Sequence, residues 1–190
     1  MSKAGKYSLW LCPLDDSSAQ THLGGIVAEY AESLGAPSFH PHVTLFSPIL
    51  ASSDSDALAQ VREYIAKLHN ELGSATLDVG IPFTARRVAT GDRYYQSVFM
   101  EGQDNMILAQ ANNIARQHWN ATAQPTFYSH SSLVYGNYTS AKREEIAAEI
   151  ASKLPEDINL LSFFAPEIHV VQTEGLCDQW RDIGSIGLST

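Results

Sequence analysis

The sequence predicts an α+β fold because strand-like and helix-like segments alternate along all of its 190 residues. Short apolar and aromatic runs bounded by proline or glycine predict strands. Longer segments with apolar residues three and four apart, most of them beginning at Ser, Thr or Asp, predict helices. No Gly/Ser-rich or Pro-rich linker divides the chain, so we expect residues 1–190 to form a single domain.

Each element follows from local signals. In chain order we expect a strand over 7–12, a helix over 17–34, a strand around 42–46, a helix over about 54–72, strands near 75–81 and 94–101, a helix over about 103–118, a strand at 130–135, a helix over 140–154, and strands near 159–164 and 167–173. The helix at 54–72 is the best defined. The Ser53/Asp54 cap begins it, an apolar stripe that includes Val61 and Ile65 runs along it, and Gly73 ends it.

Two strand-like segments repeat one motif. The first copy of the motif is His42-Val43-Thr44-Leu45, and the second is His130-Ser131-Ser132-Leu133. Residues two apart on a strand point to the same face, so each copy presents an imidazole together with a hydroxyl. A chance histidine on an ordinary strand explains one copy better than two, so we interpret the pair as a candidate active site.

Two histidines and two hydroxyls suit hydrolysis of a phosphodiester without a metal ion. One imidazole takes a proton from water and the other gives a proton to the leaving oxygen, and imidazole can do both near neutral pH. The hydroxyls of Thr44 and Ser132 are short, neutral donors for the non-bridging phosphate oxygens. Neutral donors match a singly charged cyclic phosphate.

These motifs resemble those of the 2H phosphoesterases, and most closely those of the plant and fungal cyclic nucleotide phosphodiesterases. The resemblance covers most of the chain and includes the segment Gly91–Val98 between the two motifs. It implies a two-lobed, pseudo-symmetric LigT-like fold, with antiparallel sheets that face a central cleft and helices outside. The α+β class itself follows from the residues.

The resemblance also implies an activity. It is the hydrolysis of ADP-ribose 1″,2″-cyclic phosphate to ADP-ribose 1″-phosphate, a step after tRNA splicing, and of nucleoside 2′,3′-cyclic phosphates to 2′-phosphates. By position, His42 and His130 are the catalytic residues and Thr44, Ser132 and Tyr135 bind the substrate. Analogy makes His130 the base and His42 the acid, although the sequence itself does not order them. Many relatives carry threonine where this chain has Ser132, and no metal or cofactor is implied.

Composition limits the class of partner. The formal charge is −9, from 12 basic and 21 acidic residues, which argues against long nucleic acid as a partner and leaves a small-molecule cyclic phosphate. The densest basic cluster is Arg86-Arg87, with Arg93 nearby. Because we find no signal peptide and no apolar stretch of membrane-spanning length, we expect a cytoplasmic protein without membrane contact, and a monomer. Cys12 and Cys177 have no metal-ligand spacing, and one disulfide between them stays open.

Three alternatives remain open. His40, His42 and His130 could instead form a metal site, although the spacing adds no carboxylate or cysteine ligand. The chain could be an RNA-end phosphodiesterase of the same superfamily, or a non-catalytic protein that binds cyclic phosphates.

A nucleobase could stack on one of five aromatic residues near the motif strands: Tyr94, Tyr95, Tyr128, Tyr135 and Trp180.

Overall fold

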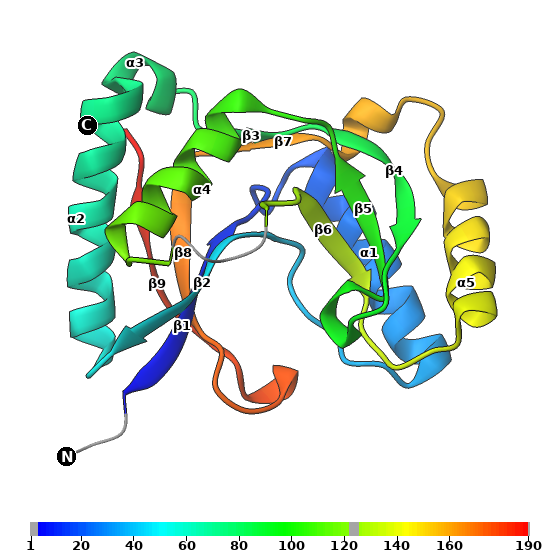
Figure 1. Ribbon diagram of the computed structural model, residues 1–190. Helices are drawn as coiled ribbons and strands as arrows, with labels where there is room; N and C mark the ends of the chain where they lie inside the picture. Colours follow the sequence, from blue (N-terminus) through cyan, green and yellow to red (C-terminus); the bar gives the residue numbers. More distant parts are fainter. Residues whose placement is uncertain (1–3, 122–125, 190) are drawn as a thin grey trace.

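The computed structural model describes residues 4–121 and 126–189. A seven-stranded antiparallel sheet has the order β4-β5-β6-β2-β1-β8-β9, and β3 and β7 form a small second sheet (Figure 1). The strands are β1 (Gly5–Leu11), β2 (Val43–Ala51), β3 (Ile81–Phe83), β4 (Ala85–Thr90), β5 (Val98–Gly102), β6 (His130–Val134), β7 (Phe163–Ala165), β8 (Glu167–Gln172) and β9 (Arg181–Gly187). The helices are α1 (Ser18–Leu34), α2 (Asp54–Leu72), α3 (Ser74–Leu77), α4 (Met106–His118) and α5 (Ser140–Lys153), with 3₁₀ turns η1 (Tyr94–Gln96), η2 (Ile158–Leu161) and η3 (Cys177–Gln179).

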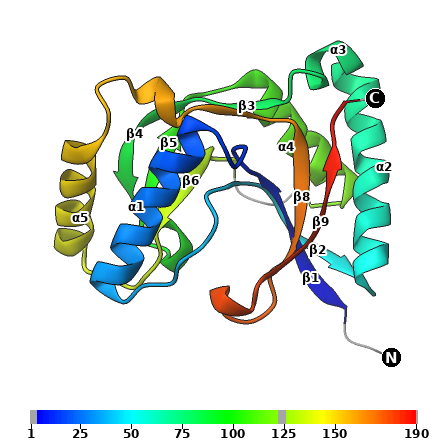
Figure 2. The ribbon, with the colours of Figure 1, turned by 180° about the vertical axis from the view of Figure 1, so that it is seen from behind.

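The large sheet consists of two halves. Strands β2-β1-β8-β9 form one half and β4-β5-β6 the other, and the single residue pair Val43–Ser131 joins them. Helices α2 and α4 cover the first half, and α1 and α5 cover the second (Figures 1 and 2). The expected α+β, two-lobed architecture with helices outside is therefore confirmed. Helix α1 follows β1 in the chain but packs against β6, so the connection crosses from one half to the other.

A continuous hydrophobic core underlies both halves. Leu45 of β2, Leu133 of β6 and Val61 of α2 belong to the same cluster of buried side chains. Burial of apolar area on this scale supplies most of the favourable free energy of folding. The shared core supports the proposal that residues 1–190 are one domain.

The helix boundaries follow the capping signals. The hydroxyl of Ser17 accepts a hydrogen bond from the amide of Gln20, and Gly35 ends α1 in the left-handed region at φ 62°. Ser53 caps α2 in the same way. The helix expected from about residue 103 begins at Met106, because the side chain of Asn105 accepts from the amides of the first turn.

Three expected strands are wrong in part. Of the segment 75–81, the first three residues belong to the short helix α3, whose one buried side chain is Leu77, and only Ile81 is extended, as the first residue of β3. The strand near 94–101 begins only at Val98, because Tyr94–Gln96 is a 3₁₀ turn. The strand near 159–164 is likewise preceded by η2, whose cap is Asp157, and only Phe163–Ala165 is extended. Apolar composition identified these segments, but local capping and turn hydrogen bonds decided their conformation.

Two strands escaped the sequence analysis. Strands β4 and β9 lie at the two edges of the large sheet, and most of their side chains are exposed or half-buried. An edge strand with water on one side needs no apolar alternation, so the pattern that predicts strands is absent. In the part of the chain that the structure describes, no helix has the length and apolarity needed to cross a membrane.

Asn112 links a helix to the first motif strand. This buried side chain of α4 donates a hydrogen bond to the carbonyl of Leu45 in β2, at 2.7 Å. Replacing Asn112 with Ala leaves that carbonyl without its donor, so we expect a loss of about 1–3 kcal/mol in the free energy of unfolding, measured with urea. Asn113→Ala, on the exposed face of the same helix, is the matched control and should change stability little. Equal effects of the two substitutions would contradict this role.

Candidate active site

The pairing of β2 with β6 places the two motifs side by side. Val43 lies opposite Ser131, and both are buried on the side of the sheet that faces the helices. Side chains alternate along a strand, and directly opposite residues of an antiparallel pair share a face. The inner face of the sheet, away from the helices, therefore receives the four flanking side chains His42, Thr44, His130 and Ser132.

His42 is held tightly on this inner face. Its Nδ1 donates a hydrogen bond to the carbonyl of His40 at 2.6 Å. Its ring stacks on Trp10, with 3.6 Å between centroids and 8° between planes, and His42 is only 4% exposed. Because Nδ1 carries the hydrogen, Nε2 is the ring nitrogen left for chemistry.

His130 repeats this geometry. Its Nδ1 donates to the carbonyl of Tyr128 at 2.8 Å, so each motif histidine bonds the carbonyl two residues before it. The Nε2 of His130 lies 3.2 Å from the side-chain nitrogen of Gln96 in η1. Both imidazoles thus have the same tautomer in the neutral state, with Nε2 free of the backbone.

Both histidines are shifted toward the neutral form. The pKa of His42 is lowered to about 3, mainly by burial and in smaller part by the nearby imidazole of His130, against the opposing effect of the His40 carbonyl. Burial also lowers the pKa of His130, and the Tyr128 carbonyl acts in the opposite direction. An anion bound beside either ring would favour the protonated form.

The two motif hydroxyls have different surroundings. Thr44 lies opposite Trp10 on β1 and is half-buried. The hydroxyl of Ser132 donates to the carbonyl of Tyr95 at 2.8 Å, so its one proton is already used. Ser132 therefore ties β6 to the turn η1 in this structure.

Tyr135 reaches the inner face through a β-bulge. On β5, Phe99 pairs with Ser132 while the preceding residue Val98 pairs with Val134, so Leu133 is an extra residue on β6. The bulge shifts the alternation by one and turns Tyr135 to the side of Ser132. Tyr135 is buried there, which raises the pKa of its hydroxyl, and its ring stacks on Phe39 with 3.8 Å between centroids.

Trp180 connects the two halves across the inner face. It follows η3 in the β8–β9 connection, which Figure 1 shows in orange and red near the bottom of the molecule. Its ring lies 5.9 Å from that of Trp10 in one half, and 5.4 Å and 6.3 Å from those of Tyr95 and Tyr135 in the other. Of the five aromatic candidates, Trp180 also lines the main cavity.

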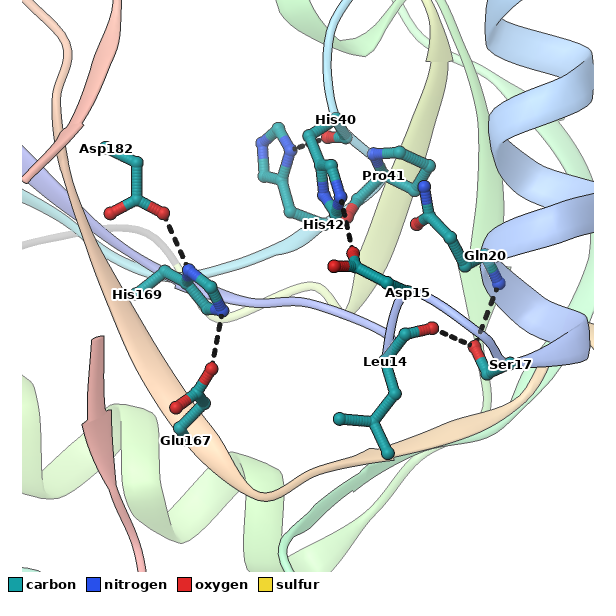
Figure 3. Close-up of polar contacts among 10 residues, drawn as sticks. All are labelled: Leu14, Asp15, Ser17, Gln20, His40, Pro41, His42, Glu167, His169 and Asp182. Atoms are coloured by element: carbon teal, nitrogen blue, oxygen red, sulfur yellow. Dashed lines mark hydrogen bonds and ion pairs between the residues drawn. The ribbon is translucent and has the colours of Figure 1, made fainter. Parts of the chain in front are cut away.

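That cavity has a volume of about 490 Å³ and lies beside Trp10. Its described lining residues are Trp10, Cys12, Pro13, Leu14, Asp15, Ser38, Phe39, His40, Pro166, Glu167, His169, Val171, Cys177, Asp178, Trp180 and Asp182. Figure 3 shows His169 between two carboxylates, with Asp182 2.7 Å from Nδ1 and Glu167 3.2 Å from Nε2. The described lining residues include four acidic side chains and neither lysine nor arginine, so this cavity disfavours phosphate groups.

The arginine pair lies on the other half of the sheet. Arg87 bonds the buried carboxylate of Glu101, and Arg86 lies 3.5 Å from the same group. Burial alone would raise the pKa of Glu101, but these partners and Tyr128 lower it. Glu101 lies opposite His130 on the neighbouring strand. The two arginines thus neutralise a carboxylate beside the site.

In the described part of the chain, the geometry gives no support to the alternative of a metal site at His40, His42 and His130. Nδ1 of His40 bonds the carbonyl of Pro41, and Nε2 of His40 faces Asp15 at 3.7 Å. Among residues 4–121 and 126–189, no three His, Cys, Asp or Glu side chains form a group that could hold a metal ion. Cys12 and Cys177 line the same cavity as free thiols, and burial raises the pKa of Cys12 to about 12.

Sequence reasoning missed two residues at the site. Trp10 was assigned only to a strand, and Gln96 only to the segment between the motifs. Both reach the histidines from other strands or turns, through register and tertiary contact. The Gly91–Val98 segment itself was the one signal that pointed to this region.

Comparison with known proteins settles the family. A family model described as "Cyclic phosphodiesterase-like protein" matches residues 6–188. The chain belongs to this family. It is thereby a member of the 2H phosphoesterase superfamily, as the two motifs indicated.

One curated relative and two solved structures agree with this family assignment. The chain is 23% identical over 172 residues to the cyclic phosphodiesterase of Arabidopsis thaliana, covering 90% of this chain and 87% of that protein. E. coli LigT without ligand has the same fold, with a TM-score of 0.60, 11% identity and full coverage of both chains. Kluyveromyces marxianus Usb1 with uridine monophosphate aligns with a TM-score of 0.54 and 15% identity over 98% of each chain.

The buried state of His42 has a consequence for stability. The folded protein keeps His42 neutral down to about pH 3, whereas the unfolded chain protonates it near pH 6.5. The unfolded state then binds more protons, so stability falls as the pH falls below 6.5, by up to about 1.4 kcal/mol per pH unit for this group. We expect His42→Gln to reduce that slope between pH 6.5 and 5 in urea unfolding, compared with the unsubstituted protein. An unaltered slope in His42→Gln would contradict the shift.

Proposed function

We propose that this protein is a metal-independent cyclic phosphodiesterase. Its substrates are ADP-ribose 1″,2″-cyclic phosphate, opened to ADP-ribose 1″-phosphate, and nucleoside 2′,3′-cyclic phosphates, opened to nucleoside 2′-phosphates. The observation that carries the proposal is the matched pair of histidines, each with Nδ1 bonded to the carbonyl two residues earlier and with Nε2 free of the backbone. The name of the Arabidopsis relative supports the same reaction class.

The two imidazoles divide the proton transfers. His130 takes a proton from water as the oxygen of that water bonds to phosphorus. The bond from phosphorus to the 3′ oxygen of a nucleoside cyclic phosphate breaks, and His42 gives a proton to that oxygen. His42 must be protonated for this step, and the phosphate monoanion beside its ring offsets the effect of burial. Release of the monoester and proton exchange with water restore both groups.

Thr44 and Ser132 hold the phosphate between the rings. Thr44 donates its hydroxyl hydrogen to a non-bridging oxygen, and Ser132 does so by exchanging its bond with the Tyr95 carbonyl for one with the phosphate. Tyr135 lies beside these residues, where its ring packs against those of Phe39 and Tyr95. Neutral donors suit a monoanion without binding a doubly charged product too tightly.

The nucleobase lies in the cavity beside Trp10. Trp180 and Phe39 supply aromatic walls there, on which a base can stack. The acidic lining residues keep additional phosphate groups out of the cavity, so those of ADP-ribose extend elsewhere along the inner face. E. coli LigT has been solved with 3′-AMP and with phosphate, and Usb1 with uridine monophosphate, which supports a small nucleotide as the ligand.

Turnover of purified protein tests the proposal. ADP-ribose 1″,2″-cyclic phosphate and the four nucleoside 2′,3′-cyclic phosphates are assayed after exhaustive EDTA treatment, with products separated by chromatography. We expect 1″-phosphate and 2′-phosphate products at undiminished rates. A loss of activity that zinc or manganese restores would contradict the two-histidine mechanism, and binding without turnover would favour the non-catalytic alternative.

Removing either histidine tests its role. We expect His42→Ala and His130→Ala each to lower kcat by about 10²- to 10⁴-fold, the usual effect of losing a positioned acid or base. Thr44→Ala and Ser132→Ala should cost less. His69→Ala is the matched control, with circular dichroism as the check on folding. Near-normal kcat in a folded single variant would remove that histidine from the mechanism.

The pKa shifts predict where activity is highest. The profile of kcat/KM reports the free protein, in which burial lowers the pKa of both histidines below about 6.5. The state with one neutral and one protonated ring is most populated midway between the two macroscopic values, so kcat/KM should peak below pH 6.5. Bound phosphate raises both values, so kcat should peak at higher pH. A kcat/KM maximum above pH 7 would contradict these shifts.

A further inference from the structure

One polar contact of the proposed base comes from outside both motifs. The side-chain nitrogen of Gln96 lies 3.2 Å from Nε2 of His130. Nδ1 of His130 must carry the hydrogen, because the Tyr128 carbonyl that it faces can only accept. Nε2 of the neutral ring is then a lone pair, and the amide nitrogen of Gln96, which is only a donor, gives it a hydrogen bond.

The position of Gln96 is fixed by the second motif strand. The turn η1 is closed by the Gln96 amide, which donates to the Arg93 carbonyl at 2.9 Å. The Ser132 hydroxyl donates to the carbonyl of Tyr95, and the amide of Gly136 donates to the carbonyl of Tyr94 at 3.0 Å. Two successive carbonyls of the turn are therefore bound to the chain that carries His130. These two hydrogen bonds set the position of the turn, and the position of the turn sets where the side chain of Gln96 lies.

We propose that Gln96 is a positioning residue for His130: in the ligand-free protein its amide hydrogen bond to Nε2 orients the ring and holds it in the neutral form, and the amide gives up that lone pair to the nucleophilic water when the substrate binds. The inference deepens the proposed function and rests on it. A donor to the lone pair stabilises the neutral ring, which is the state from which a general base acts. Because Nε2 has one lone pair, the Gln96 amide and the water occupy it in turn. Ser132 contributes indirectly, because its hydroxyl holds the turn that presents Gln96.

Three other residues face His130, and each acts on it in a different way from Gln96. Glu101 faces it from β5, but Arg86 and Arg87 neutralise that carboxylate. His42 faces it from β2 and disfavours a second positive charge nearby. Tyr128 contributes a carbonyl that accepts from Nδ1 in both protonation states. Gln96 is the partner on Nε2, the nitrogen that gains and loses the proton.

Adding a negative charge at this one contact gives a direct test. In Gln96→Glu a carboxylate replaces the amide donor beside Nε2 and favours the protonated ring. We expect the His130 pKa in the ligand-free protein to rise by about one unit or more, measured by NMR on the protein with ¹³C-labelled histidine. Gln110→Glu, on the exposed surface of α4, is the matched control for added charge and should leave His130 unmoved.

Kinetics separate positioning from a general effect on structure. In Gln96→Glu the limb of kcat/KM that reports His130 should move to higher pH by the same amount as the NMR titration, while the other limb stays in place. Gln96→Leu removes the hydrogen bond without adding charge. It should shift the His130 titration by less than Gln96→Glu does, because the neutral ring loses its donor but gains no anion.

The outcomes distinguish this inference from the proposed function. A His130 titration that is unmoved in Gln96→Glu, or that moves as far in Gln96→Leu as in Gln96→Glu, overturns the role of Gln96. A shifted titration in a protein that turns over no cyclic phosphate supports the contact and overturns the proposed function instead. Loss of kcat in Gln96→Glu with no displacement of either limb would show a purely structural effect and would also overturn the inference.

Discussion

The site depends on a single residue pair at the junction of the two half-sheets. Val43 and Ser131 join β2 to β6, and the alternation of side chains then sets the four motif residues on one face. A slip of one residue in either strand would turn that strand's histidine and hydroxyl into the core. The core residues behind the junction, including Leu45 and Leu133, fix the register because they would be exposed by such a slip.

Burial prepares the histidines and also constrains them. Each ring donates Nδ1–H to the backbone two residues earlier, which selects the tautomer, and burial lowers the pKa of both rings and so favours their neutral form. Stacking on Trp10 holds His42 still, whereas the Gln96 amide occupies Nε2 of His130. In the proposed function, phosphate binding supplies the charge that protonates one ring. Substrate binding and proton placement are thereby coupled.

Much of this could be predicted from the sequence, and the failures have physical causes. Caps such as Ser17 and Ser53 fixed helix starts, and the His-x-Thr/Ser spacing placed each imidazole with its hydroxyl, because both signals are local. Edge strands β4 and β9 carry no apolar alternation, so they were missed. Trp10, Gln96 and the bulge at Leu133 depend on register between strands that are distant in sequence, which no local pattern encodes.

The most direct test of the paired-histidine account is the ³¹P NMR spectrum of uridine 2′,3′-cyclic phosphate incubated with the protein in EDTA. The cyclic resonance should be replaced by that of the 2′-monophosphate alone. The double variant His42→Ala/His130→Ala should leave the cyclic phosphate intact, with a defect far smaller than the product of the single ones, because the two groups act as a unit. Formation of the 3′-monophosphate, or turnover by the folded double variant at the normal rate, would contradict the account.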